Sequence, residues 1–199
     1  MIAAQFKELV LQSLTHERGG VLVYQTALDC ARNEQLHDEW TKYLAQTQNH
    51  VAVLTQLCVS LGLDPGEMTP GCRIVQSTGK ALVTAMKMAL AEGNAVAAEL
   101  VACECVVLAE TKDHADWELL GECAPTLEGE AANILTEAVQ QIEEEEDEHL
   151  YHTQGWCREL WLKSLGLEAV LPPPEESEHV TSAAGAEKAK KERPAQRAR

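Results

Sequence analysis

The sequence predicts an all-α protein, an elongated bundle of long antiparallel helices, and three observations lead to this fold class. Apolar residues recur every three or four positions over long stretches without proline, which is the spacing of one buried helical face. Only 4% of the residues are aromatic, and the apolar residues are mostly Ala, Leu and Val. Such a composition favours closely packed helices over a β-sandwich. Clusters of Gly and Pro separate the periodic stretches and mark where the helices end.

The chain length and charge limit what the protein can be. It has 199 residues, 45% of them hydrophobic, which is enough for one well-cored domain that we expect to cover residues 1–171. The formal net charge is −16, and because residues 187–199 hold six basic and two acidic side chains, residues 1–186 carry −20. A body of this charge repels nucleic acid and anionic membranes and concentrates cations. We therefore expect metal ions, and neither nucleic acid nor a membrane, as partners.

Cysteine usage and the N-terminus indicate the compartment. The seven cysteines form no CxxC pair, which is typical of reduced thiols in a cytosolic protein. Lys7 and Glu8 interrupt the apolar residues of the N-terminus, so no secretory signal is evident. The most apolar region, residues 95–109, is broken by Glu99 and Glu104 and is too short to span a bilayer. The expected location is cytoplasmic.

The first two helices are predicted over residues 2–31 and 33–61. Asn33 supplies a cap for the second helix, and Gly62 with Pro65 behind it provides a termination signal. At about 1.5 Å per residue, helices of this length belong to elongated bundles. The apolar stripes of both helices pass through polar residues: Phe6, Val10, Leu14, Glu17, Val21, Tyr24 and Leu28 in the first, and Leu36, Trp40, Tyr43, Thr47, His50, Leu54, Leu57 and Leu61 in the second.

The third helix follows a long connection. Residues 63–78 are rich in Gly and Pro and are long enough to cross from one end of the bundle to the other. Ser77 or Thr78 then opens a helix in which Gly93–Asn94 predicts a break or kink. The helix continues to a turn at residues 123–129. Its stripe again passes from apolar residues into polar ones: Leu82, Met86, Ala89, Val96, Leu100, Cys103, Val107, Glu110, His114 and Trp117.

The fourth helix is predicted from about residue 127 to residue 164, with Gly166 at its end. It contains six consecutive acidic residues, Glu143 to Glu148, which must point in several directions because a helix turns once every 3.6 residues. After three consecutive prolines, residues 172–199 lack apolar periodicity and are predicted to be a disordered tail that the fold can lose. The stripe of the fourth helix runs through Leu135, Ala138, Ile142, Glu145, His149, His152 and Trp156.

Counting residues from the two hairpin turns places polar residues at a common level. Glu17 lies 16 residues before Asn33, and His50 lies 17 residues after it, so antiparallel helices bring the two to the same height. Glu110 lies 17 residues before Leu127 in the second hairpin. At or near its level we expect Glu145, Glu146 and His149, with His114 one turn nearer the loop and His152 closer to the rim.

Each of these residues alone has a structural explanation. A single inward histidine is often a hydrogen-bonded core residue, and Glu145 and Glu146 could belong to a solvated acidic face. Together they are harder to explain, because several carboxylates in one core repel each other and lose their hydration. They would stay protonated or unfold the bundle unless cations neutralised them. The joint pattern therefore favours metal binding over a purely structural bundle.

At these residues the chain resembles the ferritin-like superfamily, which includes rubrerythrins, manganese catalases and bacterioferritins. That family places a Glu from two helices and a Glu-x-x-His from two others around a pair of metal ions in a four-helix bundle with a long crossover. Glu17 and Glu110 match the single glutamates, and Glu146 with His149 matches one Glu-x-x-His. The second helix departs from the pattern, because Thr47 stands three residues before His50 with Gln46 beside it. The third helix adds His114.

The resemblance implies a metal site with Glu17, His50, Glu110, His114, Glu146 and His149 as ligands, and with Glu145 and His152 as further candidates. It implies iron or manganese, with zinc also open since carboxylate and imidazole suit all three. The implied chemistry is oxidation of ferrous iron or consumption of oxygen or peroxide in stress protection. The alternative is a non-catalytic acidic helical bundle that stores metal or binds a partner. A homodimer is compatible with either hypothesis.

Overall fold

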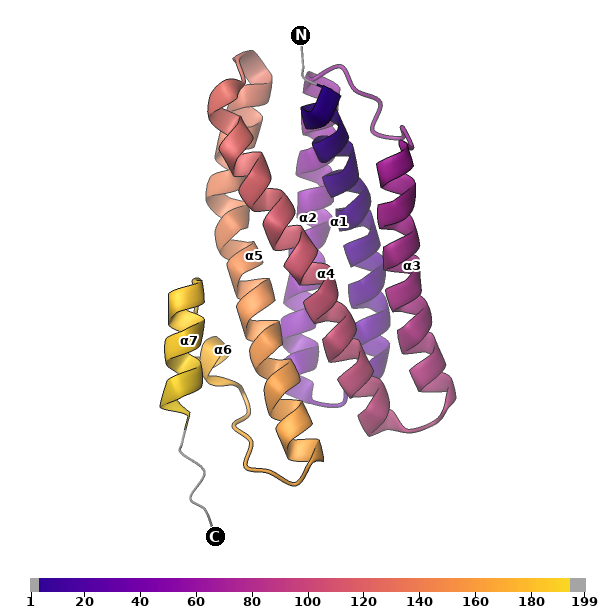
Figure 1. Ribbon diagram of the computed structural model, residues 1–199, viewed down its shortest axis with the longest axis vertical. Helices are drawn as coiled ribbons and strands as arrows, with labels where there is room; N and C mark the ends of the chain where they lie inside the picture. The colour runs from indigo at the N-terminus through magenta and orange to yellow at the C-terminus, as the bar shows by residue number, and fades with distance from the viewer. Residues whose placement is uncertain (1–3, 194–199) are drawn as a thin grey trace.

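The computed structural model describes residues 4–193, and all the secondary structure in this range is helical, which confirms the all-α prediction (Figure 1). None of the described helices is both long enough and apolar enough to cross a bilayer. All seven cysteines lie in the described range, and none forms a disulfide bond. The helices are α1 (Ala4–Cys30), α2 (Glu34–Ser60), α3 (Pro70–Ala91), α4 (Ala95–Cys123), the short 3-10 helix η1 (Ala124–Thr126), α5 (Gly129–Ser164), α6 (Pro174–Ser177) and α7 (Ala183–Glu192).

Four of the long helices surround the core. α1 packs against α2, α2 against α5, α5 against α4, and α4 against α1, so the four form a closed ring. α3 lies outside this ring, where it packs against α1 and α4 (Figure 1). Successive long helices run in opposite directions, and α3 returns the chain from the end at which α2 stops to the end at which α4 starts (Figure 1).

The buried apolar residues form two clusters instead of one continuous core. One cluster includes Tyr24, Tyr43 and Trp156, and lies toward the α1–α2 turn. The other includes Leu14, Leu54, Trp117 and Ile142, and lies toward the opposite end of the bundle. On every helix of the ring the change from one cluster to the other takes place at a buried polar residue. The middle of the bundle is therefore a polar layer between two apolar layers.

The third helix starts earlier than the sequence predicts. The prediction placed its first residue at Ser77 or Thr78, whereas α3 begins at Pro70. Thr69 is its N-cap, and the hydroxyl oxygen of Thr69 accepts a hydrogen bond from the backbone N–H of Cys72. Proline at the first helical position has no N–H to satisfy, so Thr69–Pro70 is a helix start that the sequence analysis overlooked. α3 itself therefore spans most of the distance that was assigned to a loop.

The break predicted at Gly93–Asn94 is a complete reversal of the chain. α3 ends at Ala91, Gly93 has a φ of +74°, and the side chain of Asn94 caps α4 by accepting from the N–H of Ala97. Glycine adopts this left-handed conformation without steric cost, which allows the tight turn. The predicted third helix is thus two antiparallel helices, of which only α4 faces the centre of the ring.

The C-terminal segment differs from the predicted disordered tail over residues 172–193. This part holds α6 and α7, both packed against α5, while residues 194–199 lie outside the described range. Arg158 on α5 holds the carboxylate of Glu175 through two hydrogen bonds of 2.6 and 2.8 Å. Arg193 donates from Nη2 to the buried carboxylate of Glu159 over 2.8 Å. These ion pairs join residues that sequence periodicity cannot connect, which is why composition alone misjudged the segment.

Candidate metal centre

The polar layer contains carboxylates and imidazoles from all four helices of the ring. α1 provides Glu17, α2 provides His50, α4 provides Glu110, and α5 provides Glu146 and His149, none more than 2% exposed. They form two groups that could each hold a cation, Glu17–His50–Glu146 and Glu110–Glu146–His149, and within each group the candidate ligand atoms lie within 4.8 Å of one another. Glu146 belongs to both groups. The arrangement therefore offers two adjacent cation positions with a shared carboxylate.

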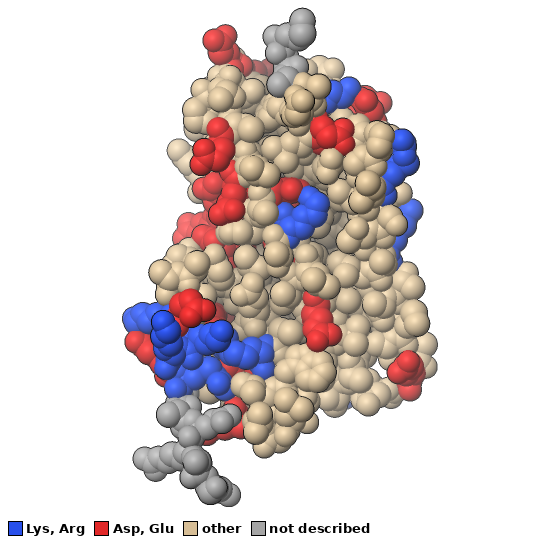
Figure 2. Space-filling view, in the orientation of Figure 1, with Lys and Arg blue, Asp and Glu red and all other residues tan. Residues whose placement is uncertain are grey.

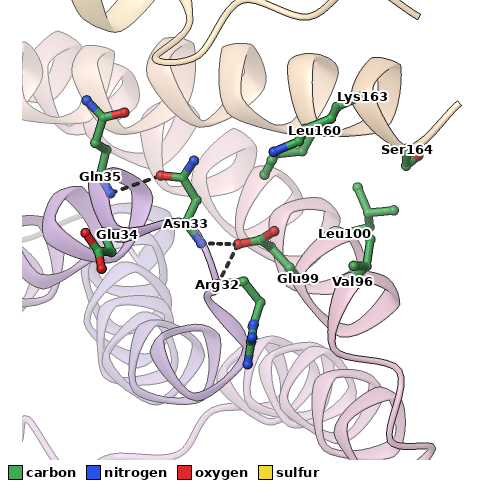
Figure 3. Close-up of a pocket in the computed structure, with 10 residues that line it drawn as sticks. All are labelled: Arg32, Asn33, Glu34, Gln35, Val96, Glu99, Leu100, Leu160, Lys163 and Ser164. Atoms are coloured by element: carbon green, nitrogen blue, oxygen red, sulfur yellow. Dashed lines mark hydrogen bonds between the residues drawn. The ribbon is translucent and has the colours of Figure 1, made fainter. Parts of the chain in front are cut away.

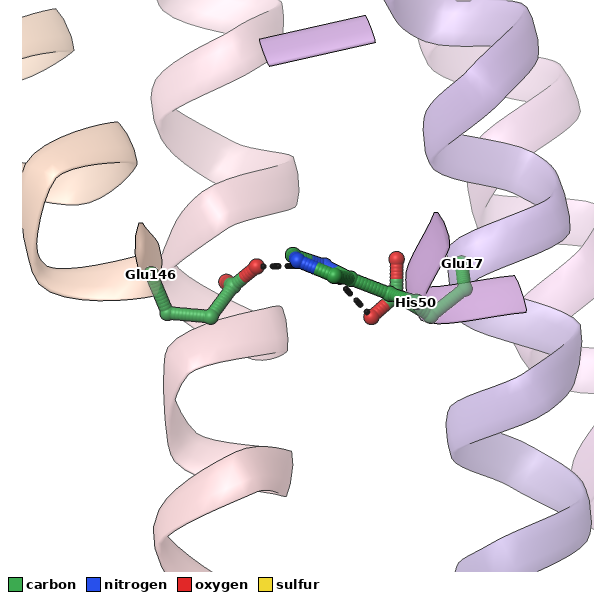
Figure 4. Close-up of side chains that lie close together, drawn as sticks. All are labelled: Glu17, His50 and Glu146. Carbon is green, nitrogen blue, oxygen red and sulfur yellow. Dashed lines mark ion pairs between the residues drawn. The ribbon is translucent and has the colours of Figure 1, made fainter. Parts of the chain in front are cut away.

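The distances within each group are similar. Nδ1 of His50 lies 3.3 Å from a carboxylate oxygen of Glu17 and 3.2 Å from one of Glu146. Nδ1 of His149 lies 3.4 Å from Glu110 and 3.4 Å from Glu146. Figure 4 shows the His50 imidazole between the carboxylates of Glu17 and Glu146, which reach it from opposite sides. The imidazole rings of His50 and His149 are stacked at an interplanar angle of 25°, and their centroids lie 5.9 Å apart.

The inward-facing atoms of this cluster lack good hydrogen bonds. Within residues 4–193, no hydrogen-bond partner exists for Nδ1 of His50, Nδ1 of His149, either oxygen of Glu146, Oε2 of Glu17 or Oε2 of Glu110. Buried polar atoms are rarely left in this state, and each case requires an explanation such as an ion. Six of the thirteen such atoms among the described residues come from these five residues, which converge on the same two positions. This is the donor set that a pair of cations would complete.

The outward-facing nitrogens of the two imidazoles are hydrogen-bonded to acceptors. Nε2 of His50 lies 2.8 Å from the carboxylate of Glu145, and Nε2 of His149 lies 3.1 Å from the amide oxygen of Gln46. Because both partners accept hydrogen bonds, Nε2 carries the proton in each ring, and in the neutral imidazole Nδ1 then holds a lone pair directed inward. Histidines that bind metals are oriented in this way by carboxylates and carbonyls. Glu145 thus supports His50 from outside instead of joining the cluster.

The charges in the cluster shift each other's pKa values. Burial alone would lower the pKa of His149, but its contacts with Glu110 and Glu146 outweigh burial and raise the pKa to about 9. The pKa of His50 is raised well above its usual value because its neighbouring carboxylates likewise outweigh burial. Burial would raise the pKa of Glu146, yet His149 and His50 bring it down to about 2. Without a cation, protonated imidazoles neutralise the carboxylates, so cation binding must release protons.

Two further predicted site residues, in addition to Glu145, lie outside the cluster. His114 is half-buried on the side of the bundle, 3.5 Å from Glu118 and 3.5 Å from Asp147. His152 is buried one turn beyond His149, and its Nδ1 lies 3.0 Å from the hydroxyl of Tyr43. Neither residue belongs to the two groups of candidate ligands, so the assignment of His114 and His152 as ligands stays a prediction. A helical stripe read in steps of three or four residues does not decide between neighbours such as residues 113 and 114.

Asp113 occupies the inward position that the sequence analysis gave to His114. It is 2% exposed, and its Oδ1 has no hydrogen-bond partner in the described part of the chain. Burial and the negative charges of Glu17 and Glu146 raise its pKa well above the usual value. One turn further along α4, Trp117 donates from Nε1 to Glu17 over 2.7 Å. Asp113 lies three residues after Glu110, and this spacing, which places two residues on the same face of a helix, was the sequence signal that could have identified it.

Thr47 is buried where the family pattern has a carboxylate. Its hydroxyl donates to the backbone carbonyl of Tyr43, one turn earlier on α2. Its methyl group faces α1, where a Cβ on Gly20 would lie 3.3 Å away. The position is thus filled by a small side chain that offers no ligand atom, and the cation position at His50 has one carboxylate fewer than the pattern.

A depression of about 730 Å³ lies at the end of the bundle near the α1–α2 turn, away from the cluster (Figure 3). Two of its polar side chains, Glu99 and Asn33, serve the turn between α1 and α2. Glu99 accepts hydrogen bonds of 2.6 and 2.7 Å from the N–H groups of Arg32 and Asn33. The side chain of Asn33 accepts from Gln35 and caps α2, as the sequence predicted. Glu99 and Asn33 therefore have structural roles at the α1–α2 turn. The candidate functional site is the polar layer in the middle of the bundle.

Comparison with known proteins adds no family. No family model matches the chain, and no match was found among curated proteins or solved structures.

Proposed function

We propose that this chain is a ferritin-like metalloprotein with a two-metal redox centre that handles ferrous iron, oxygen or peroxide. One ion would be held by Glu17, His50 and Glu146, and the other by Glu110, His149 and Glu146. Iron or manganese suits such a set of carboxylates and imidazoles, and zinc is a third choice. The ring of α1, α2, α4 and α5, with α3 as the crossover, supports the ferritin-like assignment in its topology.

One observation carries this proposal: inward atoms without hydrogen-bond partners converge from four helices on two adjacent positions. These atoms approach each other as ion pairs of 3.2–3.4 Å but do not meet hydrogen-bond geometry, and an unsatisfied buried polar atom costs about 1–3 kcal/mol. Instead, hydrogen bonds are made by the outward nitrogens of both histidines. The cluster is thus oriented for a ligand that is positively charged and small.

The chain's own residues would hold and orient the ions. Glu17 and Glu110 would each help to hold one ion, and the indole N–H of Trp117 fixes the position of Glu17. Glu146 would contribute to holding both ions, because it belongs to both groups. A bound redox-active ion supplies electron exchange with oxygen or peroxide, and the surrounding carboxylates favour its more highly charged oxidised form. Tyr24 and Tyr43 pack against the His149 ring and belong to the apolar layer that keeps bulk water away from this side.

The test begins with metal-free protein titrated anaerobically with ferrous iron, manganese and zinc, followed by exposure of the ferrous form to oxygen or peroxide. We expect two ions per chain, and ferrous iron in the protein should be oxidised faster than free ferrous ion in the same buffer. The matched control is Glu17→Gln combined with Glu110→Gln, which keeps the side-chain shapes and should react no faster than free iron. Helical circular dichroism of the variant would show that its fold is retained.

The alternative function is a non-catalytic acidic bundle that stores metal or binds a partner, and the small Thr47 side chain in place of a carboxylate favours it. In that case the protein would bind zinc in stoichiometric amounts without accelerating the oxidation of iron or manganese. That result would contradict the redox proposal and support the alternative. Failure to bind any of the three ions would contradict both the redox proposal and the metal-storage alternative.

A further inference from the structure

Two adjacent glycines in the middle of α1 have different surroundings. A glycine inside a helix costs about 1 kcal/mol relative to alanine, so each one requires a reason. For Gly20 the reason is packing, because an added Cβ would lie 3.3 Å from the methyl group of Thr47. A Cβ added at Gly19 would have no neighbour within 4 Å. Packing therefore does not require glycine at position 19.

The space beside Gly19 belongs to two neighbouring hollows beside α1 and the outer helix α3, which share Gly19 and Gly79 in their lining. The inner one is a cavity of about 170 Å³ bounded by α1, α3 and α4, and the outer one is a groove of about 390 Å³ between α1 and α3. Gly19 and Gly79 line both hollows, and a Cβ on Gly79 would come within 3.7 Å of the Cα of Gly19. The volume of the groove is in the range of small-molecule binding sites, about 300–1,000 Å³.

The groove combines an apolar lining with positive charge. Leu22, Met68 and Val83 provide apolar surface, and Leu22 is 52% exposed although it is large and aliphatic. Arg18, Lys80 and Lys87 line the same groove. Arg18 donates to the backbone carbonyl of Pro65 and Lys80 to the amide oxygen of Gln76, so neutral groups receive these hydrogen bonds. Figure 2 shows Lys and Arg atoms along the edge formed by α3.

We propose that this groove binds a small amphipathic carboxylate, with its apolar chain along Leu22, Met68 and Val83 and its anionic head at Arg18, Lys80 and Lys87. Three cations around one apolar groove are complementary to such a molecule, and none of the residues that line the groove is acidic. Gly19 leaves open space in the lining of this groove, because an added Cβ would meet no atom within 4 Å. The site is separate from the metal cluster, and the proposal does not depend on metal binding.

The test is to titrate the full-length protein with dodecanoate below its micellar concentration. Calorimetry measures the affinity and stoichiometry of binding, and the rise in melting temperature gives a second measure of binding. We expect saturable binding of one molecule per chain. Lys80→Glu combined with Lys87→Glu should weaken binding at least tenfold. The matched control, Lys188→Glu with Lys190→Glu, makes the same charge change on exposed residues of α7 and should leave the affinity within twofold. Gly19→Leu fills the hollow and should also weaken binding at least tenfold.

Two other probes separate the contributions of chain and head. Dodecyltrimethylammonium has the same chain with a positive head, and butyrate has the same head with a short chain, so both should bind at least tenfold more weakly than dodecanoate. Equal binding of the cationic probe, unsaturable binding of dodecanoate, or an unchanged affinity in the Lys80 and Lys87 variant would each overturn the proposal. If Gly19→Leu fails to fold, the variant with Lys80→Glu and Lys87→Glu still decides the test.

Discussion

Glu146 belongs to both groups of candidate ligands, and this sharing distinguishes it from its neighbours on α5. The acidic run around it contains residues with very different surroundings. Glu144 is exposed, Glu145 is half-buried against His50, and Glu146 is 1% exposed with neither oxygen hydrogen-bonded to any described residue. A run of similar residues therefore holds three different roles, because each step along the helix rotates the side chain by about 100°.

Substituting Glu146 should affect both cation positions at once. Glu146→Gln is expected to abolish stoichiometric binding of both ions, whereas Glu110→Gln should reduce binding from two ions to one, because Glu17, His50 and Glu146 stay in place. Glu144→Gln is the matched control on the same helix and should bind two ions. Anaerobic calorimetry with elemental analysis measures the stoichiometry. A similar loss in the Glu144 and Glu146 variants would mean that the acidic run attracts cations only diffusely.

His152 should make the stability of the metal-free protein depend on pH. Burial and the charges of Lys42 and His179 lower its pKa to about 4 from a usual value of 6.5, against the opposing charge of Glu148. The folded protein keeps this imidazole neutral, while the unfolded chain takes up a proton below about pH 6.5. The stability it contributes is therefore present above that pH and is lost as the pH falls toward 4.

The matched variant is His152→Phe, which keeps an aromatic ring but does not titrate. Between pH 7.5 and pH 5 the wild type should lose about 2 kcal/mol more unfolding free energy than the variant. Urea denaturation at the two pH values measures this difference, and other titrating groups cancel in the comparison. A difference that does not change with pH would show that His152 titrates normally.

At the scale of a helix, the glycine pair of α1 gives a direct comparison. Gly19→Ala should raise the unfolding free energy by about 0.5–1 kcal/mol, because helix propensity improves and the added methyl group meets open space. Gly20→Ala should gain less or lose stability, because its Cβ would press on the methyl group of Thr47. Denaturant melts of the two single variants measure both effects.

Thr47→Ser removes that methyl group while it retains the hydroxyl. In this background Gly20→Ala should recover the stabilisation seen at Gly19, giving a coupling energy between residues 20 and 47. Equal effects of the two glycine variants in the natural background would show that α1 and α2 are not in close contact at this level.

At the scale of the whole molecule, the C-terminal segment should stabilise the bundle, contrary to the prediction made from composition. A chain that ends at Leu171 loses Glu175, the partner of Arg158, and loses Arg193, a partner of Glu159, which is 0% exposed. Breaking a buried ion pair costs about 3–5 kcal/mol, and each kcal/mol lowers the melting temperature of a chain of this length by about 2–4 °C, so the melting temperature should fall by about 6–20 °C. A chain that ends at Arg193 keeps all of these contacts and should melt like the full chain. Equal melting of the two truncations would show that the segment contributes little.

The sequence by itself determined the elements and the levels of the cluster. Apolar spacing identified long helices, and a fixed rise of about 1.5 Å per residue placed Glu17 opposite His50, which the structure brings to 3.3 Å. The same count placed Glu110 near Glu146 and His149. Distances along a helix depend only on the number of residues, so this information is local and can be obtained without knowledge of the packing.

Only the tertiary structure decided how each helix is rotated and what packs outside the ring. A rotation by one residue moves a side chain by about 100°, which is why Asp113 faces inward and His114 does not. The position of α3 beside α1, and the pairing of Arg193 with a glutamate 34 residues earlier, depend on contacts between distant segments. Such contacts leave no periodic signal in the sequence, because they are selected by the shape and charge of surfaces that exist only after the helices have packed.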